Sequence, residues 1–488
     1  MTDEQLTFTY MKTNYILFIL CFWILPMQSQ YTTIPDPIFE QELIDQGIDT
    51  NPVIDHQVLT SVINNRTTLN IEVDNINNFE GLQDFTNLET LKITGYNPTP
   101  VLNLENNLLL KHILLYNFAS ILSLDLTNNI LLETIDIDSN SLTNINISTC
   151  INLKELDLSY CPITNIDLSN YPNLEKLGLY RLNLTSLDIN NNLALKEIAL
   201  LYIPFTSLDF SNNTNLEEIS LINLGGPSTI FNGLLFTNNV NLKKLIVDVV
   251  SFYPTVNLQN NLQLETCLLQ SAGLFYLDVL NNISLKILRI DNNFFNDINI
   301  QNLNQLQIFG CSYNNISSLN FDNHPFLEVL FCDSNDLQNL NIQNGANSLL
   351  NGTISNGPAI NERFNATDNP NLRCIYVDDV ANCNANWLSK DPTSYYVATV
   401  QECNLLSTTT NLNSKFTLSP NPVENFLNIS TPIDLEIYSI KIFTIDGKQI
   451  QVYYNNFEQL DLSNLATGIF TIEMTTNSGK YFKKLIKK

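Results

Sequence analysis

Residues able to carry out general acid–base or nucleophilic chemistry are few in this 488-residue chain, and they do not cluster. The three histidines, His56, His112 and His324, lie in unrelated segments. No serine–histidine–aspartate spacing, metal-ligand cluster or phosphate-binding glycine loop stands out. Asp378 and Asp379 are adjacent on a predicted strand, so their side chains point in opposite directions rather than forming a catalytic pair. The sequence therefore predicts a protein that is not an enzyme.

Aspartates recur at one position of a repeated pattern, at Asp125, Asp167, Asp188 and Asp209. Stacked carboxylates could bind calcium, which prefers oxygen ligands. However, no glycine-rich ion loop accompanies them, and Asn146 interrupts the series. We interpret these aspartates as structural and expect neither a metal ion nor a cofactor.

Tyrosine, arginine and aliphatic residues recur where a repeated strand is expected to end at the surface, and such residues are enriched at the centres of protein interfaces. An exposed tyrosine row could equally stack on sugar rings, and a third interpretation is that the tyrosines pack along the rim of neighbouring repeats. The candidate patch for a protein or glycan ligand comprises Tyr116, Tyr160, Tyr180, Arg181, Leu201, Tyr202 and Ile222.

Nine cysteines are present, and they fall into groups with different expected roles. Cys267, Cys311 and Cys332 occupy predicted inward positions, where a thiol acts as a small buried hydrophobe. Three more cysteines cluster near the end of the repeats, in a chain predicted to be exported, where disulfides persist. We expect a disulfide between Cys374 and Cys403, which leaves Cys383 over.

A leucine lattice with a period of mostly 21 residues supplies the element that positions these groups. Within each unit the LxxLxL pattern alternates, so a short strand has one buried and one displayed face. Such a period marks a solenoid, whose units bury their apolar faces by stacking. The units open at Leu88, Leu110, Leu132, Leu153, Leu174, Leu195, Leu216, Leu242, Leu264, Leu285, Leu306 and Leu327.

The residue after each opening leucine alternates in charge through ten consecutive units, which places opposite charges side by side on neighbouring strands. The alternation continues across the long unit from Leu216 to Leu242, so this unit is predicted to be one repeat with an insertion at 225–233. The alternating residues are Glu89, Lys111, Glu133, Lys154, Glu175, Lys196, Glu217, Lys243, Glu265 and Lys286.

The net charge of −26 argues against nucleic acid and anionic membrane surfaces as partners. Near the N-terminus, Lys12 precedes an apolar run from Tyr15 to Leu25, which is typical of a secretory signal peptide at residues 11–30. The run is too short for a membrane anchor, and we expect no transmembrane segment in the mature chain. Asp36 and Pro37 predict the start of a helix that ends near Gly47 and caps the first repeat.

The lattice, with its second LDLS-like half, resembles the bacterial leucine-rich repeats of 21 residues over 88–350. This resemblance implies a mainly β solenoid with short parallel strands on its inner face and, more often than catalysis, an interaction surface. Residues 351–405, which contain Leu372, Trp387 and Asp391, resemble the closing cap of exported Bacteroidetes repeat proteins.

After a polar linker at 406–415, residues 416–488 predict a small β-sandwich with hairpins at Asp446-Gly447 and Asn477-Ser478-Gly479. This region resembles the type A C-terminal sorting domain of the type IX secretion system, although Phe470 stands where that family usually has tyrosine. The resemblance implies transport by outer-membrane secretion machinery. Its motif residues are Pro420, Asn421, Pro422, Gly447, Gly468 and Lys484.

Together these features predict a secreted or cell-surface protein with a signal peptide at 11–30, an N-terminal cap at 31–87, a solenoid at 88–350 and a cap at 351–405, followed by the linker and the sorting domain. The expected function is non-catalytic protein binding or adhesion. The alternative is a glycan-binding or passive surface-layer component.

Overall fold

The computed structural model describes residues 30–96, 102–117, 121–138, 141–205, 208–224, 230–231, 236–249, 251–252, 255–356, 359–404, 406, 416–431, 436–444, 447–477 and 479–488. The predicted signal peptide therefore lies outside the described residues, apart from Gln30, as do Asp446 and Ser478 of the predicted hairpins and most of the linker. The described chain forms two compact units. The first contains most residues before Asp336 and the segment Leu349–Asp368, and the second contains the remaining described residues.

The first unit begins with a small cap. Strand β1 (Tyr31–Thr33) pairs antiparallel with β2 (Gln57–Leu59), and helix α2 (Pro37–Asp45) lies between them in sequence. The Asp36 side chain accepts hydrogen bonds from the backbone nitrogens of Ile38 and Phe39, which confirms the expected helix start. Helix α3 (Thr60–Ile63) and the short helix η1 (Leu82–Asp84) complete this region.

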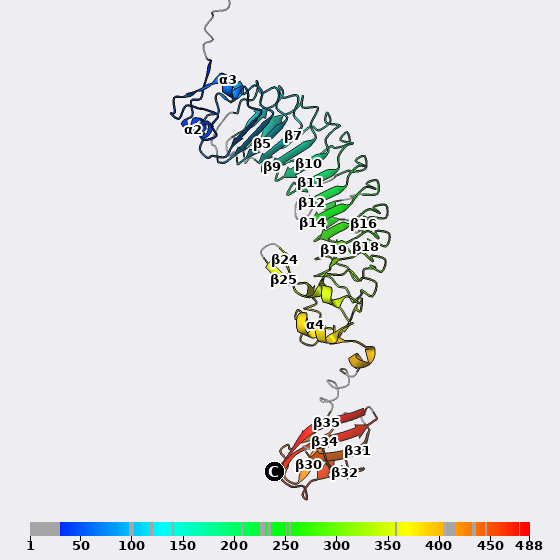
Figure 1. Ribbon diagram of the computed structural model, residues 1–488. Helices are drawn as coiled ribbons and strands as arrows, with labels where there is room; N and C mark the ends of the chain where they lie inside the picture. Colours follow the sequence, from blue (N-terminus) through cyan, green and yellow to red (C-terminus); the bar gives the residue numbers. More distant parts are fainter. Residues whose placement is uncertain are drawn as a thin grey trace, which may run out of the picture. The chain divides into compact units, whose positions relative to one another are not determined.

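A parallel sheet of fourteen short strands lines the inner side of the curved first unit (Figure 1). In strands such as β9, β10 and β11, buried leucines or isoleucines alternate with displayed residues, as the LxxLxL pattern predicts. The strands in chain order are β3 (Thr68–Ile71), β4 (Thr90–Thr94), β5 (His112–Tyr116), β7 (Thr134–Asp138), β9 (Glu155–Ser159), β10 (Lys176–Tyr180), β11 (Glu197–Leu201), β12 (Glu218–Ile222), β14 (Lys244–Asp248), β17 (Thr266–Gln270), β19 (Ile287–Arg289), β20 (Ile308–Gly310), β22 (Val329–Phe331) and β26 (Phe364–Asn365).

The long repeat after Leu216 keeps its place in this sheet. Strand β12 pairs directly with β14, with Glu218 opposite Lys244, so the insertion lies between two neighbouring rungs and does not break the sheet. Lys243 forms an ion pair with Glu217 at 2.6 Å, which confirms that the charge alternation crosses the insertion. Within the insertion the described part is β13 (Ile230–Phe231), which pairs with β15 (Ser251–Phe252).

Short strands on the outer side of the coil form a second, less continuous series. β6 (Ser123–Asp125) pairs with β8 (Asn144–Asn146), and β16 (Thr255–Asn257) pairs with β18 (Tyr276–Asp278), all in parallel. In these segments an exposed or half-buried aspartate or asparagine follows an inward aliphatic residue, as the second half of the repeat predicts; Leu124, Val256 and Leu277 are buried and Ile145 is half-buried. Each coil of the first unit therefore encloses an apolar core between its inner and outer strands.

Buried asparagines connect the rungs at the third position before the opening leucine. Each side-chain amide nitrogen donates to two backbone carbonyls of preceding turns; Asn213, for example, contacts the carbonyls of Ile189 and Asn192 at 3.0 Å. Cys150, Tyr171 and His324 occupy equivalent positions. The ladder consists of Asn107, Asn129, Asn192, Asn213, Asn239, Asn261 and Asn282. The ladder thus gives these carbonyls a second donor beside their backbone partners and links each turn to the next.

The end of the repeat region contains further parallel strands. In the second unit β21 (Ser318–Asn320), β23 (Asn339–Ile342), β27 (Cys374–Val377) and β28 (Tyr395–Val397) form one sheet, so rung-like pairing continues beyond residue 350. Helix α4 (Val380–Asn386) is capped by the Asp379 side chain, and η2 spans Asn347–Leu350. A hairpin of β24 (Thr353–Asn356) and β25 (Ala359–Glu362) belongs to the first unit.

Two antiparallel sheets form the C-terminal β-sandwich. One consists of β29 (Thr417–Ser419), β30 (Phe426–Ser430) and β33 (Gln459–Asp461). The other consists of β31 (Ile437–Thr444), β32 (Gln449–Tyr453), β34 (Gly468–Thr476) and β35 (Gly479–Lys487). Leu427, Ile442, Ile472 and Leu485 are among the residues of their shared core. Strands β31 and β32, and β34 and β35, pair as the two predicted hairpins, and the mainly β fold class is confirmed.

No helix among the described residues is long and apolar enough to cross a bilayer.

Candidate functional site

Four of the predicted patch residues form one contact cluster at the C-terminal ends of β9–β11. Tyr180 is the last residue of β10, whereas Tyr160, Arg181 and Tyr202 follow their strands with φ of 51–55°. In this conformation the backbone nitrogen of Arg181 donates to the Leu201 carbonyl at 2.9 Å, and Tyr160 and Tyr202 make the same contact to their next rungs. The chain therefore turns out of the sheet at the same point on three successive rungs, which brings these side chains together.

Arg181 lies between the three tyrosines. Its guanidinium carbon is 5.0–5.5 Å from the centroids of all three rings, within the range of cation–π attraction. The rings of Tyr160 and Tyr180 meet edge to face at 4.8 Å, and those of Tyr180 and Tyr202 at 5.5 Å. We call Tyr160, Tyr180, Arg181 and Tyr202 the tyrosine–arginine cluster. Arg181 and Tyr202 are exposed and Tyr160 and Tyr180 are half-buried, and these contacts limit the positions of all four side chains.

Hydrogen bonding within the cluster affects its ionisation. The Tyr160 and Tyr180 hydroxyls are 3.2 Å apart, and this hydrogen bond raises the pKa of Tyr160. In the described part of the chain no carboxylate forms an ion pair with Arg181. The cluster thus presents hydroxyl groups around one guanidinium group, which lies over the faces of the three rings.

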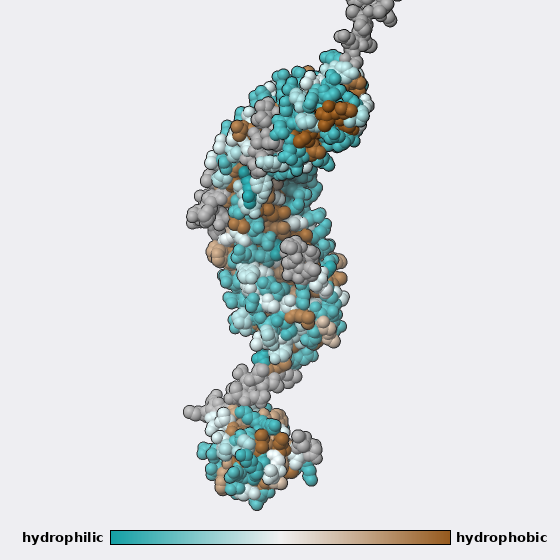
Figure 2. Space-filling view, turned by 90° about the vertical axis from the view of Figure 1, so that its left-hand side faces the viewer, coloured by the Kyte–Doolittle hydropathy of each residue, from teal (hydrophilic) through white to brown (hydrophobic). Residues whose placement is uncertain are grey.

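The sheet surface next to the cluster is shallow. The middle residues of β10, β11 and β12 are Gly178, Ala199 and Ser220, which lie in register and carry small side chains. Leu201 and Ile222 of the predicted patch end β11 and β12 beside them and are half-buried. Figure 2 views the side where the inner strands lie in Figure 1, and shows apolar patches within a largely hydrophilic surface.

Tyr116, the remaining predicted patch residue, is not part of the cluster. It ends β5, three strands away from β10, and its hydroxyl donates to Asp136 at 2.5 Å. Burial, this hydrogen bond and the surrounding carboxylates raise the pKa of Tyr116. Tyr116 therefore belongs to an acidic group of the sheet rather than to the aromatic one.

That acidic group escaped the sequence interpretation. Asp136 of β7 lies directly opposite Asp157 of β9, and Asp138 ends β7. Burial and the neighbouring Asp136 charge raise the pKa of both Asp157 and Asp138. Gly178 makes room for this group, because a Cβ at that position would collide with the Asp157 carboxylate. The sequence does contain a signal for this group: in two adjacent repeats the residue between the last two apolar positions of LxxLxL is an aspartate, Asp136 in one and Asp157 in the next.

A second polar network lies on the same sheet further along the chain. Arg289 forms an ion pair with Asp291 at 2.7 Å, and Gln270 donates to the same carboxylate. The Asp291 side chain also accepts a hydrogen bond from the Ser312 backbone, and the Ser312 hydroxyl donates to Asp333 at 2.6 Å. Arg289 and Asp291 are thus paired in charge, and hydrogen bonds through Ser312 link them to Asp333 on the following rungs.

The recurring aspartates of the outer strands serve the backbone. The Asp125, Asp167, Asp188 and Asp209 carboxylates each accept a hydrogen bond from the backbone nitrogen two residues further on, at 2.8–3.0 Å. Asn293, Asn314 and Asn335 act similarly at the bend of the later coils, where their side chains donate to and accept from the backbone. Among the described residues no group of histidine, cysteine and carboxylate side chains has the arrangement of a metal site.

The cysteines divide as their environments suggest. Cys374 and Cys403 form a disulfide with Cα atoms 5.9 Å apart, whereas Cys383 is free and buried. Cys267, Cys311 and Cys332 are also buried, as predicted. Burial raises the pKa of the Cys267 thiol to about 12, so the thiol stays protonated at neutral pH.

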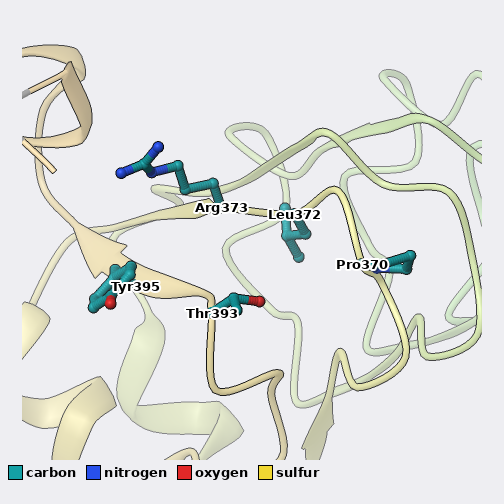
Figure 3. Close-up of a pocket in the computed structure, with 5 residues that line it drawn as sticks. All are labelled: Pro370, Leu372, Arg373, Thr393 and Tyr395. Atoms are coloured by element: carbon teal, nitrogen blue, oxygen red, sulfur yellow. The ribbon is translucent and has the colours of Figure 1, made fainter. Parts of the chain in front are cut away.

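A surface hollow of about 300 Å³ lies near the disulfide (Figure 3). Its lining comes from the segment before β27 and the segment leading into β28. The Arg373 guanidinium donates to the Leu406 carbonyl. The lining contains no carboxylate, histidine or thiol, so these side chains offer no nucleophile–base pair. The lining residues are Pro370, Leu372, Arg373, Thr393 and Tyr395.

The predicted sorting-motif residues lie on the sandwich. The Asn421 side chain donates to the Lys484 carbonyl and accepts from the Ile486 nitrogen, both at 2.8 Å, which ties the entry segment to β35. Pro420, Pro422 and Lys484 are exposed. Gly447 follows the first hairpin turn with φ of 84°, a conformation that favours glycine, and Gly468 begins β34.

The parallel rungs with their inward leucines define a leucine-rich-repeat solenoid. Residues 417–488 match the family described as the secretion system C-terminal sorting domain, so the predicted sorting domain is present, and it indicates export to the cell surface or secretion. No curated protein matches the chain at a significant level.

Two solved structures of bacterial leucine-rich-repeat proteins are similar to this chain. The functional domain of InlJ from Listeria monocytogenes is 17% identical, with a TM-score of 0.44 over 94% of this chain and 99% of that one. An internalin, inlF, from Listeria monocytogenes is 18% identical, with a TM-score of 0.46 over 64% of this chain and 92% of that one.

Proposed function

We propose that this protein is a non-catalytic binding or adhesion module that bacteria display on the cell surface or release. In this proposal the signal peptide at 11–30 directs the chain across the inner membrane, and the type IX machinery recognises the C-terminal domain at the outer membrane. The tyrosine–arginine cluster then contacts a protein ligand.

The observation that carries the binding role is the position of Arg181 among three tyrosine rings on successive rungs. The rings limit the rotamers of the guanidinium group and of each other, so little side-chain entropy remains to be lost when a ligand binds. Tyrosine and arginine are also the residue types on which protein interfaces most depend. Half-buried Leu201 and Ile222 extend this surface with apolar area.

The chemistry of the remaining polar groups supports a non-catalytic role. The described thiols outside the disulfide are buried, and the aspartates of the outer strands are engaged with backbone nitrogens. On the inner sheet the Tyr116 hydroxyl is held by Asp136, and Asp291 is held by Arg289. The aspartates, Tyr116 and Asp291 are therefore engaged in contacts within the fold. Catalysis would instead require them to contact a general base or a nucleophile.

A glycan ligand is the second candidate. The tyrosine faces and hydroxyls of the cluster suit sugar rings, and the small side chains of Ala199 and Ser220 leave room beside it for a flat ligand. Screens of the full chain on a glycan array and on an array of purified proteins distinguish the two. Protein hits support adhesion, sugar hits support the glycan alternative, and silence on both favours a passive surface component.

The export step has its own test. Deleting residues 416–488 should leave the protein in the periplasm of a host with the secretion system, as measured by fractionation and surface protease accessibility. Asn421→Ala, which removes the contacts to β35, should reduce surface delivery. Asn428→Ala, which removes an exposed contact with Gln459, should not. Surface appearance of the deleted chain would refute the sorting role.

A further inference from the structure

An exposed aliphatic row follows one edge of the first unit, on the side where the inner strands begin. It consists of the residue directly after each ladder asparagine or its equivalent, once per rung over nine rungs. Six of these side chains are 52–60% exposed: Leu108, Ile130, Ile151, Leu193, Leu262 and Ile283. Val240 is 46% exposed, and Pro172 and Thr214 complete the nine positions. We call these nine residues the edge stripe.

The backbone beneath the edge stripe is rigid and regular. Each ladder side chain immediately before a stripe residue is bonded to the rung before it, as Asn261 is to the Asn239 carbonyl at 2.8 Å. Exposed asparagines add a second set of bonds beside the stripe, such as Asn215 to the Leu193 carbonyl. The stripe residues therefore repeat at the spacing of sheet strands, about 4.8 Å.

The charges along the stripe are balanced, although the chain carries a net charge of −26. The residue three positions after each stripe residue alternates between lysine and glutamate. Five lysines of this row form ion pairs of 2.6–2.8 Å with the glutamate of the preceding rung, as Lys154 does with Glu133. A second copy of this chain can therefore approach this edge without facing the acidic excess of the molecule.

The area also suits a second copy. A row of seven half-exposed aliphatic side chains presents an apolar surface on the order of several hundred Å², which monomeric proteins seldom leave open to water. A stable interface covers about 800 Å² on each partner, of which the stripe would form the apolar centre and the bordering lysine–glutamate row the polar rim. An edge with the same strand spacing matches it rung for rung, and a second copy supplies that edge.

We propose that two copies of this protein associate through their edge stripes in an antiparallel, two-fold arrangement. A rotation of 180° about the line that bisects the curved solenoid places the edge stripe of one copy against that of the other, with the order of the rungs reversed. If this two-fold axis passed through the rung of Leu193, the central one of the nine, each lysine of the lysine–glutamate row would face a lysine of the partner and each glutamate a glutamate. An axis between the Leu193 and Thr214 rungs places Lys196 opposite the partner's Glu217 and sets opposite charges against each other on the neighbouring rungs. This register also places Ile151 against the partner's Leu262.

Sedimentation velocity of the full chain over a range of concentrations tests the association. We expect a reversible dimer that the combined variant Ile151→Ser, Leu193→Ser and Leu262→Ser converts to a monomer with an unchanged circular dichroism spectrum. The matched control replaces Leu122, Phe275 and Tyr313, which are 57–63% exposed and lie off the stripe, and should dimerise as the unaltered chain does. A monomeric unaltered chain, or a stripe variant that still dimerises, overturns the proposal.

Cysteine cross-linking tests the register. The double variant Ile151→Cys with Leu262→Cys should form an intermolecular disulfide under mild oxidation, because the two positions face each other across the interface. Ile151→Cys alone should not, because five rungs separate it from its own copy in the dimer. Cross-linking of the single variant to the same extent, or none in the double variant, contradicts this arrangement. Neither outcome depends on the proposed ligand at the tyrosine–arginine cluster, which lies at the opposite ends of the strands.

Discussion

The ladder asparagines show how single side chains hold the solenoid together. The buried carbonyls at the bends of the coil each accept one hydrogen bond from a backbone nitrogen of their own turn, which leaves their second lone pair open. Each ladder asparagine donates to two such carbonyls, so one side chain links successive rungs. Arg181 acts similarly at the surface, where one cation fixes the positions of three tyrosines.

Replacing a ladder asparagine should be far more damaging than replacing an exposed one. Asn213→Ala removes the side-chain donor from the Ile189 and Asn192 carbonyls, which keep their backbone donors, and each lost hydrogen bond should cost about 0.5–1.5 kcal/mol. Asn215→Ala removes one exposed bond to Leu193 and should cost less than about 0.5 kcal/mol. Hydrogen exchange of the amides in β11 and β12 measures both losses. Equal protection in the two variants would contradict the role of the ladder.

The facing aspartates give a pH dependence with a defined sign. The pKa of Asp157 is raised in the folded protein by burial and by Asp136, so its contribution favours folding at low pH and is lost as pH rises through the folded pKa. Asp157→Asn should therefore raise the thermal midpoint at pH 7, by an amount equivalent to less than about 1 kcal/mol. The difference from the unaltered chain should disappear below about pH 3.

Asp167→Asn is the matched control, because hydrogen bonds from Ser169 lower the pKa of Asp167. Its contribution to stability is present above the unfolded pKa and is lost as pH falls, so this variant should lower the midpoint at pH 7. Thermal scans from pH 3 to 8 compare the two. The account of the facing aspartates fails if both substitutions shift the midpoint in the same direction.

At the scale of elements, the leucine spacing and the charge alternation were sufficient to predict the strands and the register across the insertion. Both patterns repeat once per rung, and each repeat places a residue beside its counterpart on the neighbouring rung. The asparagine ladder was not predicted, because the chain also has asparagine at many other positions of the repeat. Residue type alone therefore does not distinguish the buried ladder asparagines from the exposed ones. The predicted register also places Asp136 opposite Asp157, so this pair could have been predicted, whereas the contacts of Arg181 depend on its side-chain rotamer, which no sequence pattern specifies.

The disulfide between Cys374 and Cys403 closes a segment of 29 residues that includes β27, α4 and β28. The sequence analysis paired the same two cysteines from their grouping near the end of the repeats. Closing a loop of this length reduces the entropy of the unfolded chain by an amount worth about 3–4 kcal/mol. Replacing both cysteines with serine should therefore make the Tyr395–Val397 strand sensitive to proteolysis at lower urea concentrations. Replacing buried, unpaired Cys383 with alanine controls for the loss of a thiol.

At the scale of the whole molecule, the repeats and the terminal domain have separate tasks. The sorting domain directs export, and its sandwich has its own core. The repeats provide two surfaces at opposite ends of the inner strands, the tyrosine–arginine cluster and the edge stripe. Repeat scaffolds separate fold from ligand, so the sequence and the leucine lattice alone predicted a surface but not its partner.

Affinity for the ligand identified by the array screens tests the central claim most directly. The unaltered chain is compared with the variant Tyr160→Ser, Tyr180→Ser and Tyr202→Ser, and with a control that replaces Tyr96, Tyr276 and Tyr313, whose side chains are 59–63% exposed elsewhere. We expect the cluster variant to bind at least about tenfold more weakly, because loss of an interface aromatic commonly costs 2 kcal/mol or more, and the control to bind normally. Equal affinity of all three chains would contradict the assignment of binding to the cluster.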